Sequence, residues 1–240
     1  GATAGALDLN GFSQTIGSLL VQTNNNAVIN NIIVDSGNTL TINGAVTFGV
    51  NANESDTNLN ASGGGAILVN SGNANFQVGA ATGDNENRVD LDFGGLGSFT
   101  ANLGTGTFRL GDAHTGTGNS TSTFKLATNN QITAASIRIG DGTGGSNTHT
   151  LTLGSGTNTL NANTFNIGSA GANIIRSGGA VVFDAGDTTG TLTLRASDGS
   201  SRATINMINT TGNTAGNMFS TLDLAGHTAD ILASTLTMAT

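Results

Sequence analysis

A short apolar unit that recurs at nearly regular intervals constrains the fold of this chain more than any other feature. Each unit holds two apolar residues on either side of one variable residue, and similar lengths of chain separate successive units. Because side chains alternate between the two faces of a strand, the apolar pair points to one side and the middle residue to the other. The units are Leu19-x-Val21, Phe48-x-Val50, Phe76-x-Val78, Phe108-x-Leu110, Ile137-x-Ile139, Phe165-x-Ile167, Leu192-x-Leu194 and Leu222-x-Leu224. Such recurrence predicts a coil of short β-strands that repeats along the chain.

A second and looser series of apolar units lies out of phase with the first, so each coil holds two or three strands. Its members are Leu40-x-Ile42, Leu68, Phe124-x-Leu126, Leu151-x-Leu153, Val181-x-Phe183 and Ile205-x-Met207. Stacked coils would bury one continuous apolar column and pair each backbone with the coils above and below. We therefore predict an all-β fold, a parallel β-solenoid of about eight coils of roughly 27–32 residues, right-handed as parallel crossovers generally are. Residues 1–240 form one solenoid segment, part of a longer rod or a subunit that stacks on others.

Composition agrees with this fold and excludes several classes of protein. The chain has 37 Gly and no Pro, as expected where corners need positive φ and interior strands donate hydrogen bonds on both edges. Good helix formers are scarce, which excludes a helical bundle and a doubly wound nucleotide-binding domain. No apolar stretch approaches the roughly 18 residues of a membrane-spanning helix. A net charge of −8 argues against nucleic acid as a partner, and the absence of Cys excludes disulfides and thiolate metal sites.

The N-terminal run Leu7-Asp8-Leu9-Asn10-Gly11-Phe12-Ser13-Gln14-Thr15-Ile16-Gly17-Ser18-Leu19 resembles the signature of the autotransporter-associated β-strand repeat proteins of bacteria. A degenerate copy lies near the other end, at Leu222-Asp223-Leu224-Ala225-Gly226-His227, with Ile231 matching Ile16. The resemblance implies a parallel β-helix stalk that is exported and displayed at the cell surface. It implies no catalytic residues, and the rest of the chain matches the family only in its Gly-, Asn- and Thr-rich short strands.

Two groups of charged residues are candidates for chemistry. Asp90 and Asp92 alternate with apolar residues and could form a carboxylate pair on the outside of the solenoid, as a polysaccharide-cleaving enzyme needs. The simpler interpretation, which we favour, is an amphipathic strand with a charged outer face. Arg109 and Arg138 occupy the middle positions of successive units and should stack, each followed shortly by an aspartate, Asp112 and Asp141. They form either a small ligand-binding wall or, as we favour, a solvated row of balanced charges.

Other motifs carry little weight. Residues 140–145 match G-x-G-x-x-G, but a strand is expected after them in place of the helix that a dinucleotide site requires. Asp112, Asp141, Asp184 and Asp187 lie in Gly-rich turns that suit calcium, yet the nonapeptide repeat of calcium-loaded rolls is absent. The histidines His114, His149 and His227 show no ligand spacing. We therefore predict no catalytic residues, no metal and no cofactor.

Three functions remain open at this stage. The first is a non-enzymatic extracellular rod, serving as a stalk, sheath or filament subunit, whose uncapped strand edges recruit a further copy end to end. The second is an adhesin or carbohydrate-binding passenger that uses one wall of the rod and contacts glycans. The third and weakest is a polysaccharide-cleaving enzyme built on Asp90 and Asp92.

Overall fold

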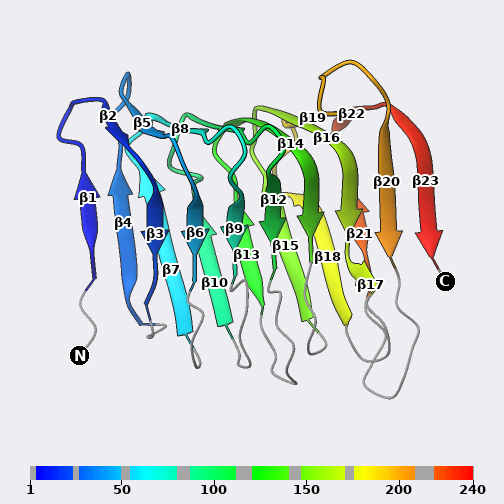
Figure 1. Cartoon of the computed structure of the whole chain (residues 1–240), viewed down its shortest axis with the longest axis horizontal. Helices are drawn as coiled ribbons and strands as arrows, with labels where there is room; N and C mark the ends of the chain where they lie inside the picture. Colours follow the sequence, from blue (N-terminus) through cyan, green and yellow to red (C-terminus); the bar gives the residue numbers. More distant parts are fainter. Residues whose placement is uncertain are drawn as a thin grey trace.

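The computed structural model describes residues 4–23, 27–49, 55–79, 87–111, 121–140, 147–170, 176–208 and 219–239. Its strands stack into one elongated parallel β-solenoid, with the two ends of the chain at opposite ends of the rod (Figure 1). The strands fall into three columns, here called A, B1 and B2, and each turn of the chain passes through them in that order. The predicted all-β parallel solenoid is therefore confirmed. No helix long and apolar enough to cross a membrane occurs in the described ranges.

Each column contains eight parallel strands within the described residues, so the chain forms eight levels. Column A holds β1 (Ala6–Asp8), β4 (Ile29–Ile33), β7 (Ser55–Ser62), β10 (Asn87–Asp92), β13 (Ser122–Lys125), β15 (Asn147–Leu153), β18 (Arg176–Phe183) and β21 (Thr221–Asp223). Column B1 holds β2 (Gln14–Ile16), β5 (Thr39–Ile42), β8 (Ala66–Asn70), β11 (Ser98–Asn102), the first parts of β14 (Asn129–Ile139) and β16 (Thr157–Ile167), β19 (Thr191–Arg195) and β22 (Thr228–Ile231). Column B2 holds β3 (Leu19–Val21), β6 (Val46–Phe48), β9 (Phe76–Val78), β12 (Thr107–Leu110), the second parts of β14 and β16, β20 (Ala203–Ile208) and β23 (Ala233–Ala239). A short β17 (Ser169–Ala170) pairs antiparallel with β18.

The core lies between column A and the two B columns and runs through every level. Strand pairing stacks inward side chains in straight rows, such as Val46, Phe76, Phe108, Ile137, Phe165 and Ile205 in column B2. At the centre, the Phe76 ring lies 4.9 Å from that of Phe108 and 5.8 Å from that of Phe124, both nearly parallel to it. Seven of the ten phenylalanines are fully buried, so most of the aromatic side chains lie in the core.

The apolar units predicted from the sequence belong to more than one column. Five of the first series lie in column B2, but Leu192-x-Leu194 belongs to column B1 and Leu222-x-Leu224 begins in column A. The unit predicted at Phe48-x-Val50 begins two residues earlier in the structure, at Val46, because Val46 and Phe48 pair with Phe76 and Val78. Val50 lies outside the described residues. The second series mixes all three columns, and in it Leu68 points outward between the buried Ile67 and Val69.

Extra residues before and after β19 explain why a regular spacing assigned the last two units to the wrong columns. In column B1, the interval from Asn158 to its partner Leu192 is longer than the interval from Asn130 to Asn158. In column B2, the interval from Asn166 to its partner Asn206 is longer than the interval from Arg138 to Asn166. The part of this extra length that follows β19 forms a corner at 196–202, closed by a hydrogen bond from the Ala196 N–H to the Ser201 carbonyl. Because these coils are longer, a unit at the earlier spacing falls in a preceding column, column B1 for Leu192-x-Leu194 and column A for Leu222-x-Leu224.

A carboxylate holds the inserted corner together. Asp198 accepts bonds from the Ser201 hydroxyl and from the Ser200 and Ser201 N–H groups, and these lower its pKa to about 2. Since the folded pKa is below the ordinary 3.8, the stabilisation by this carboxylate is present above that value and is lost as the pH falls through about 2.

The two copies of the repeated motif make the same corner at the first and last levels. The Asp8 carboxylate accepts from the Asn10 N–H at 2.8 Å, and the Asp223 carboxylate accepts from the Ala225 N–H at 3.0 Å. In both, a glycine with positive φ follows, 78° at Gly11 and 81° at Gly226. Ile16 and Ile231 also occupy the same inward row of column B1. The internal repeat seen in the sequence is thus a structural repeat.

Candidate binding face on column A

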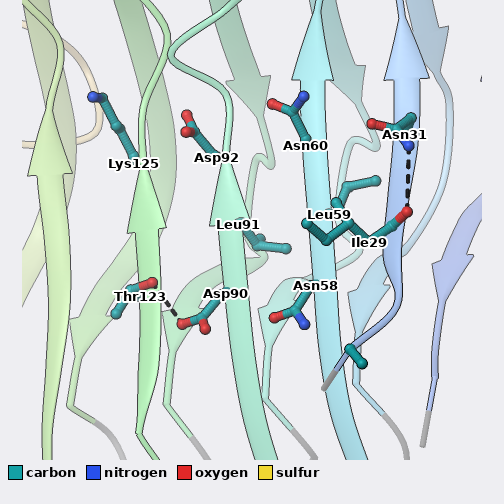
Figure 2. Close-up of a pocket in the computed structure, with 11 residues that line it drawn as sticks. Ile29, Asn31, Asn58, Leu59, Asn60, Asp90, Leu91, Asp92, Thr123 and Lys125 are labelled. Carbon is teal, nitrogen blue, oxygen red and sulfur yellow. Dashed lines mark hydrogen bonds between the residues drawn. The ribbon is translucent and has the colours of Figure 1, made fainter. Parts of the chain in front are cut away.

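The outer face of column A carries an open groove of about 1040 Å³ that spans β4, β7, β10 and β13. Strand register places its outward side chains in two rows across these strands, as Figure 2 shows. The upper row, called here the Lys125 row, consists of Asn31, Asn60, Asp92 and Lys125. The lower row, the Asp90 row, consists of Ile29, Asn58, Asp90 and Thr123. Adjacent strands in a sheet lie about 4.8 Å apart, so each row offers polar groups at that spacing.

Both aspartates predicted from the sequence lie in this groove, and each already has hydrogen-bond partners. Asp90 accepts a hydrogen bond from the Thr123 hydroxyl at 2.8 Å and forms an ion pair with Arg88 at 2.5 Å. Asp92 accepts from the Gly94 N–H at 2.7 Å, which closes the corner after β10. The pair therefore occupies two different rows on one amphipathic strand, as the favoured interpretation expected.

Lys125 provides the positive charge of the groove. Its ammonium group forms an ion pair with Asp184 at 2.5 Å, and β13 pairs it in register with Asp92. The hydrogen bond to Asp184 raises the pKa of Lys125, and the charge of Asp92 adds to the effect. Both partners of this ion pair are about half exposed, so the pair contributes little to stability and can exchange partners with a ligand.

Arg109 and Arg138 stack as predicted, but on column B2 and away from the two aspartates of the groove. They are direct register partners, and Gln77 precedes them in the same outward row. The Gln77 side chain is buried and donates to the Gly79 and Gly111 carbonyls at 3.0 and 3.2 Å. Further along the row, the Asn206 amide donates to the Asn166 side chain at 2.8 Å. Asp112 and Asp141, the predicted counterparts of the arginines, lie outside the described residues.

The remaining candidates form structural contacts. Asp187 caps its own corner: the Thr189 N–H and hydroxyl donate to it and lower its pKa. The His227 ring stacks on Phe183 with centroids 3.7 Å apart and lies 3.5 Å from Asp187. His149 is buried on β15 and accepts from the Ser122 N–H at 3.1 Å, and His114 lies outside the described residues. No three metal-binding side chains converge in the ranges that the structure describes.

Sequence reasoning missed the partners of the two aspartates in the groove. Each aspartate has an asparagine, Asn58 or Asn60, at the equivalent position one coil before it. One coil after it lies Thr123 or Lys125. The common signal is a polar-apolar-polar pattern at nearly the coil period, which the search for apolar units did not use. No family model, curated protein or solved structure matches this chain.

Proposed function

We propose that this chain is a structural rod displayed outside a bacterial cell, as a stalk, sheath or filament subunit. The observation that supports it best is the single core whose inward rows run in register through all eight levels. Within the described residues, every strand of the three columns between the first and last levels is bonded on both edges, so a force along the rod is shared by three columns of hydrogen bonds. Display outside the cell rests on the resemblance of residues 7–19 to the bacterial repeat proteins.

Immunogold labelling of the source bacterium tests this role. Antibodies against the purified chain should label surface fibres or a sheath on intact cells, and deleting the gene should remove both the label and the labelled structure. Label confined to the cytoplasm, or a surface structure that is unchanged by the deletion, would show that the rod has another function.

The groove on column A favours a second function, carbohydrate binding. Amide, carboxylate and ammonium groups in rows at about 4.8 Å can each exchange hydrogen bonds with successive hydroxyl groups of an extended glycan. The groove also contains the exposed Ile29, which offers an apolar contact at its edge. This role is compatible with a rod that also acts as an adhesin.

A glycan array, followed by calorimetry on any hit, tests the second function. Removing Asn60 and Asp92 by Asn60→Ala/Asp92→Ala should weaken binding about tenfold or more, because two or more hydrogen bonds are lost. The matched control is Asn166→Ala/Asn206→Ala, which removes two polar side chains from the opposite wall and should leave binding unchanged. An array without hits, or equal loss in both variants, would exclude the groove as a glycan site.

A further inference from the structure

The first and last levels expose strand edges and core side chains that are covered at every other level. Within the described residues, β1, β2 and β3 pair on one edge only, as do β21, β22 and β23. Ile205 on β20 is 3% exposed, whereas Leu236 and Met238, which continue the inward rows of this column at the last level, are 57% and 69% exposed. Open edges with apolar side chains are sites for pairing with a further strand.

Three of the four inward rows in the B columns begin and end with large apolar side chains. In column B2 the two rows begin with Leu19 and Val21 and end with Leu236 and Met238. In column B1 one row begins with Ile16 and ends with Ile231, and the fourth row begins with Gln14 and ends with the small Ala229. A last level placed on a first level would therefore set an apolar side chain on an apolar side chain in three rows, and the small Ala229 on Gln14 in the fourth.

Column A adds two further matches. The row that begins at Ala6 ends at Asp223, so this carboxylate would meet a small neutral residue. The residues that follow Ala6 and Asp223 along the chain are both apolar, Leu7 at the first level and Leu224 at the last. The junction would stack these two side chains in the core. Asp8 belongs to the next outward row along the strand from that of Asp223, so the two carboxylates are offset and do not repel each other directly.

From this match we propose that the C-terminal edge of one copy pairs with the N-terminal edge of a second copy, head to tail. Only this polarity keeps the strands parallel and the coil direction continuous across the junction, whereas two like ends would oppose their strands. Because this head-to-tail contact continues the coil stacking along the rod axis, successive copies do not curve back into a ring and form an open filament. The inference rests on the proposed structural role and names the second copy as the partner of the rod.

Cysteine cross-linking tests both the polarity and the register. The outward row of column B2 begins at Leu20 and ends at Thr237, so these positions become neighbours across the junction. Adjacent Cα atoms in a sheet lie within the range of about 4.4–6.8 Å that a disulfide spans. Because the chain has no native Cys, Leu20→Cys and Thr237→Cys can be prepared singly, and only their mixture should form a dimer under oxidation. Dimers formed equally by either variant alone would overturn the head-to-tail polarity.

Sedimentation velocity across a broad range of concentration tests assembly itself. The unmodified chain should form linear oligomers, and Leu236→Lys/Met238→Lys should weaken association about tenfold or more, since two apolar contacts are lost and charge enters the edge. Thr235→Lys/Thr237→Lys is the control, with equal charge on the outward side of the same strand, and circular dichroism shows whether each variant is folded. A folded, unmodified chain that stays monomeric overturns the inference but leaves a single-chain stalk possible, whereas assembly with cytoplasmic immunogold label overturns only the surface role.

Discussion

Phe76→Ala should lower the free energy of unfolding by about 3–5 kcal/mol, the usual cost of removing a buried phenylalanine from a packed core. Phe76 is 1% exposed on β9. Its ring lies 4.9 to 5.8 Å from the rings of Phe48, Phe99, Phe108 and Phe124, which come from all three columns. Neighbouring levels are fixed by backbone hydrogen bonds and cannot close around the cavity, so the cost should be near the upper end. Urea unfolding followed by circular dichroism measures it.

Phe12→Ala provides the matched control, because Phe12 is 65% exposed at the first level. In dilute solution, where copies do not meet, this variant should unfold within about 0.5 kcal/mol of the unmodified chain. A change of less than about 1 kcal/mol for Phe76→Ala would mean that the aromatic cluster does not hold the central levels together.

Much of this fold follows from the sequence because a solenoid repeats one local rule. The alternation of Phe108-x-Leu110 or Phe165-x-Ile167 identifies a strand and its buried face, and the interval to the next unit gives the length of a coil. What such units do not specify is the column to which each belongs. Leu192-x-Leu194 and Ile205-x-Met207 are equivalent as patterns, and only the strand pairs show that the first lies in column B1 and the second in column B2.

The candidate site was predictable only in part, for the same reason. Asp90 and Asp92 are visible as an outward pair on one strand, whereas their neighbours in the groove come from strands one full coil away on either side. A small error in register moves a side chain to the next row, and the length of a coil varies by more than such an error. Arg109 and Arg138 could be stacked correctly because both occupy the middle position of an apolar unit in consecutive coils.

Asparagine side chains in stacked strands can form ladders of amide hydrogen bonds, and one such pair lies inside this core. Asn130 and Asn158 are buried in the inward row that contains Phe99 and Leu192, where the other members are mostly apolar. The Asn130 amide donates to the Asn158 side-chain oxygen at 2.8 Å. That oxygen also accepts from the Gly154 N–H at 2.9 Å, and the Asn158 amide donates to the Gly154 and Thr191 carbonyls at 2.8 and 3.1 Å. One side chain thus joins three consecutive levels at a corner.

Asn158→Ala should therefore lower the free energy of unfolding by about 3–5 kcal/mol, although it removes few atoms, because it leaves several buried groups without their bonds. The buried groups are the Gly154 N–H, the Gly154 carbonyl and the Asn130 amide, and the Thr191 carbonyl is partly buried; each buried unsatisfied group costs about 1–3 kcal/mol. Nor can the corner move to re-form these bonds easily, because Gly154 packs so close to the Ala127 carbonyl that a Cβ on it would clash. Urea unfolding again gives the magnitude, and hydrogen exchange should show loss of protection at the Gly154 amide first.

Asn129→Ala is the control for this prediction, since Asn129 is exposed next to the buried ladder and also bonds across levels. Its side-chain oxygen accepts from the Thr157 N–H and hydroxyl, both at 3.1 Å. Water can replace these bonds, so we expect a loss of about 1 kcal/mol or less. Equal losses in Asn129→Ala and Asn158→Ala would contradict the argument, because they would show that burial of the amide ladder adds nothing to the cost of breaking it.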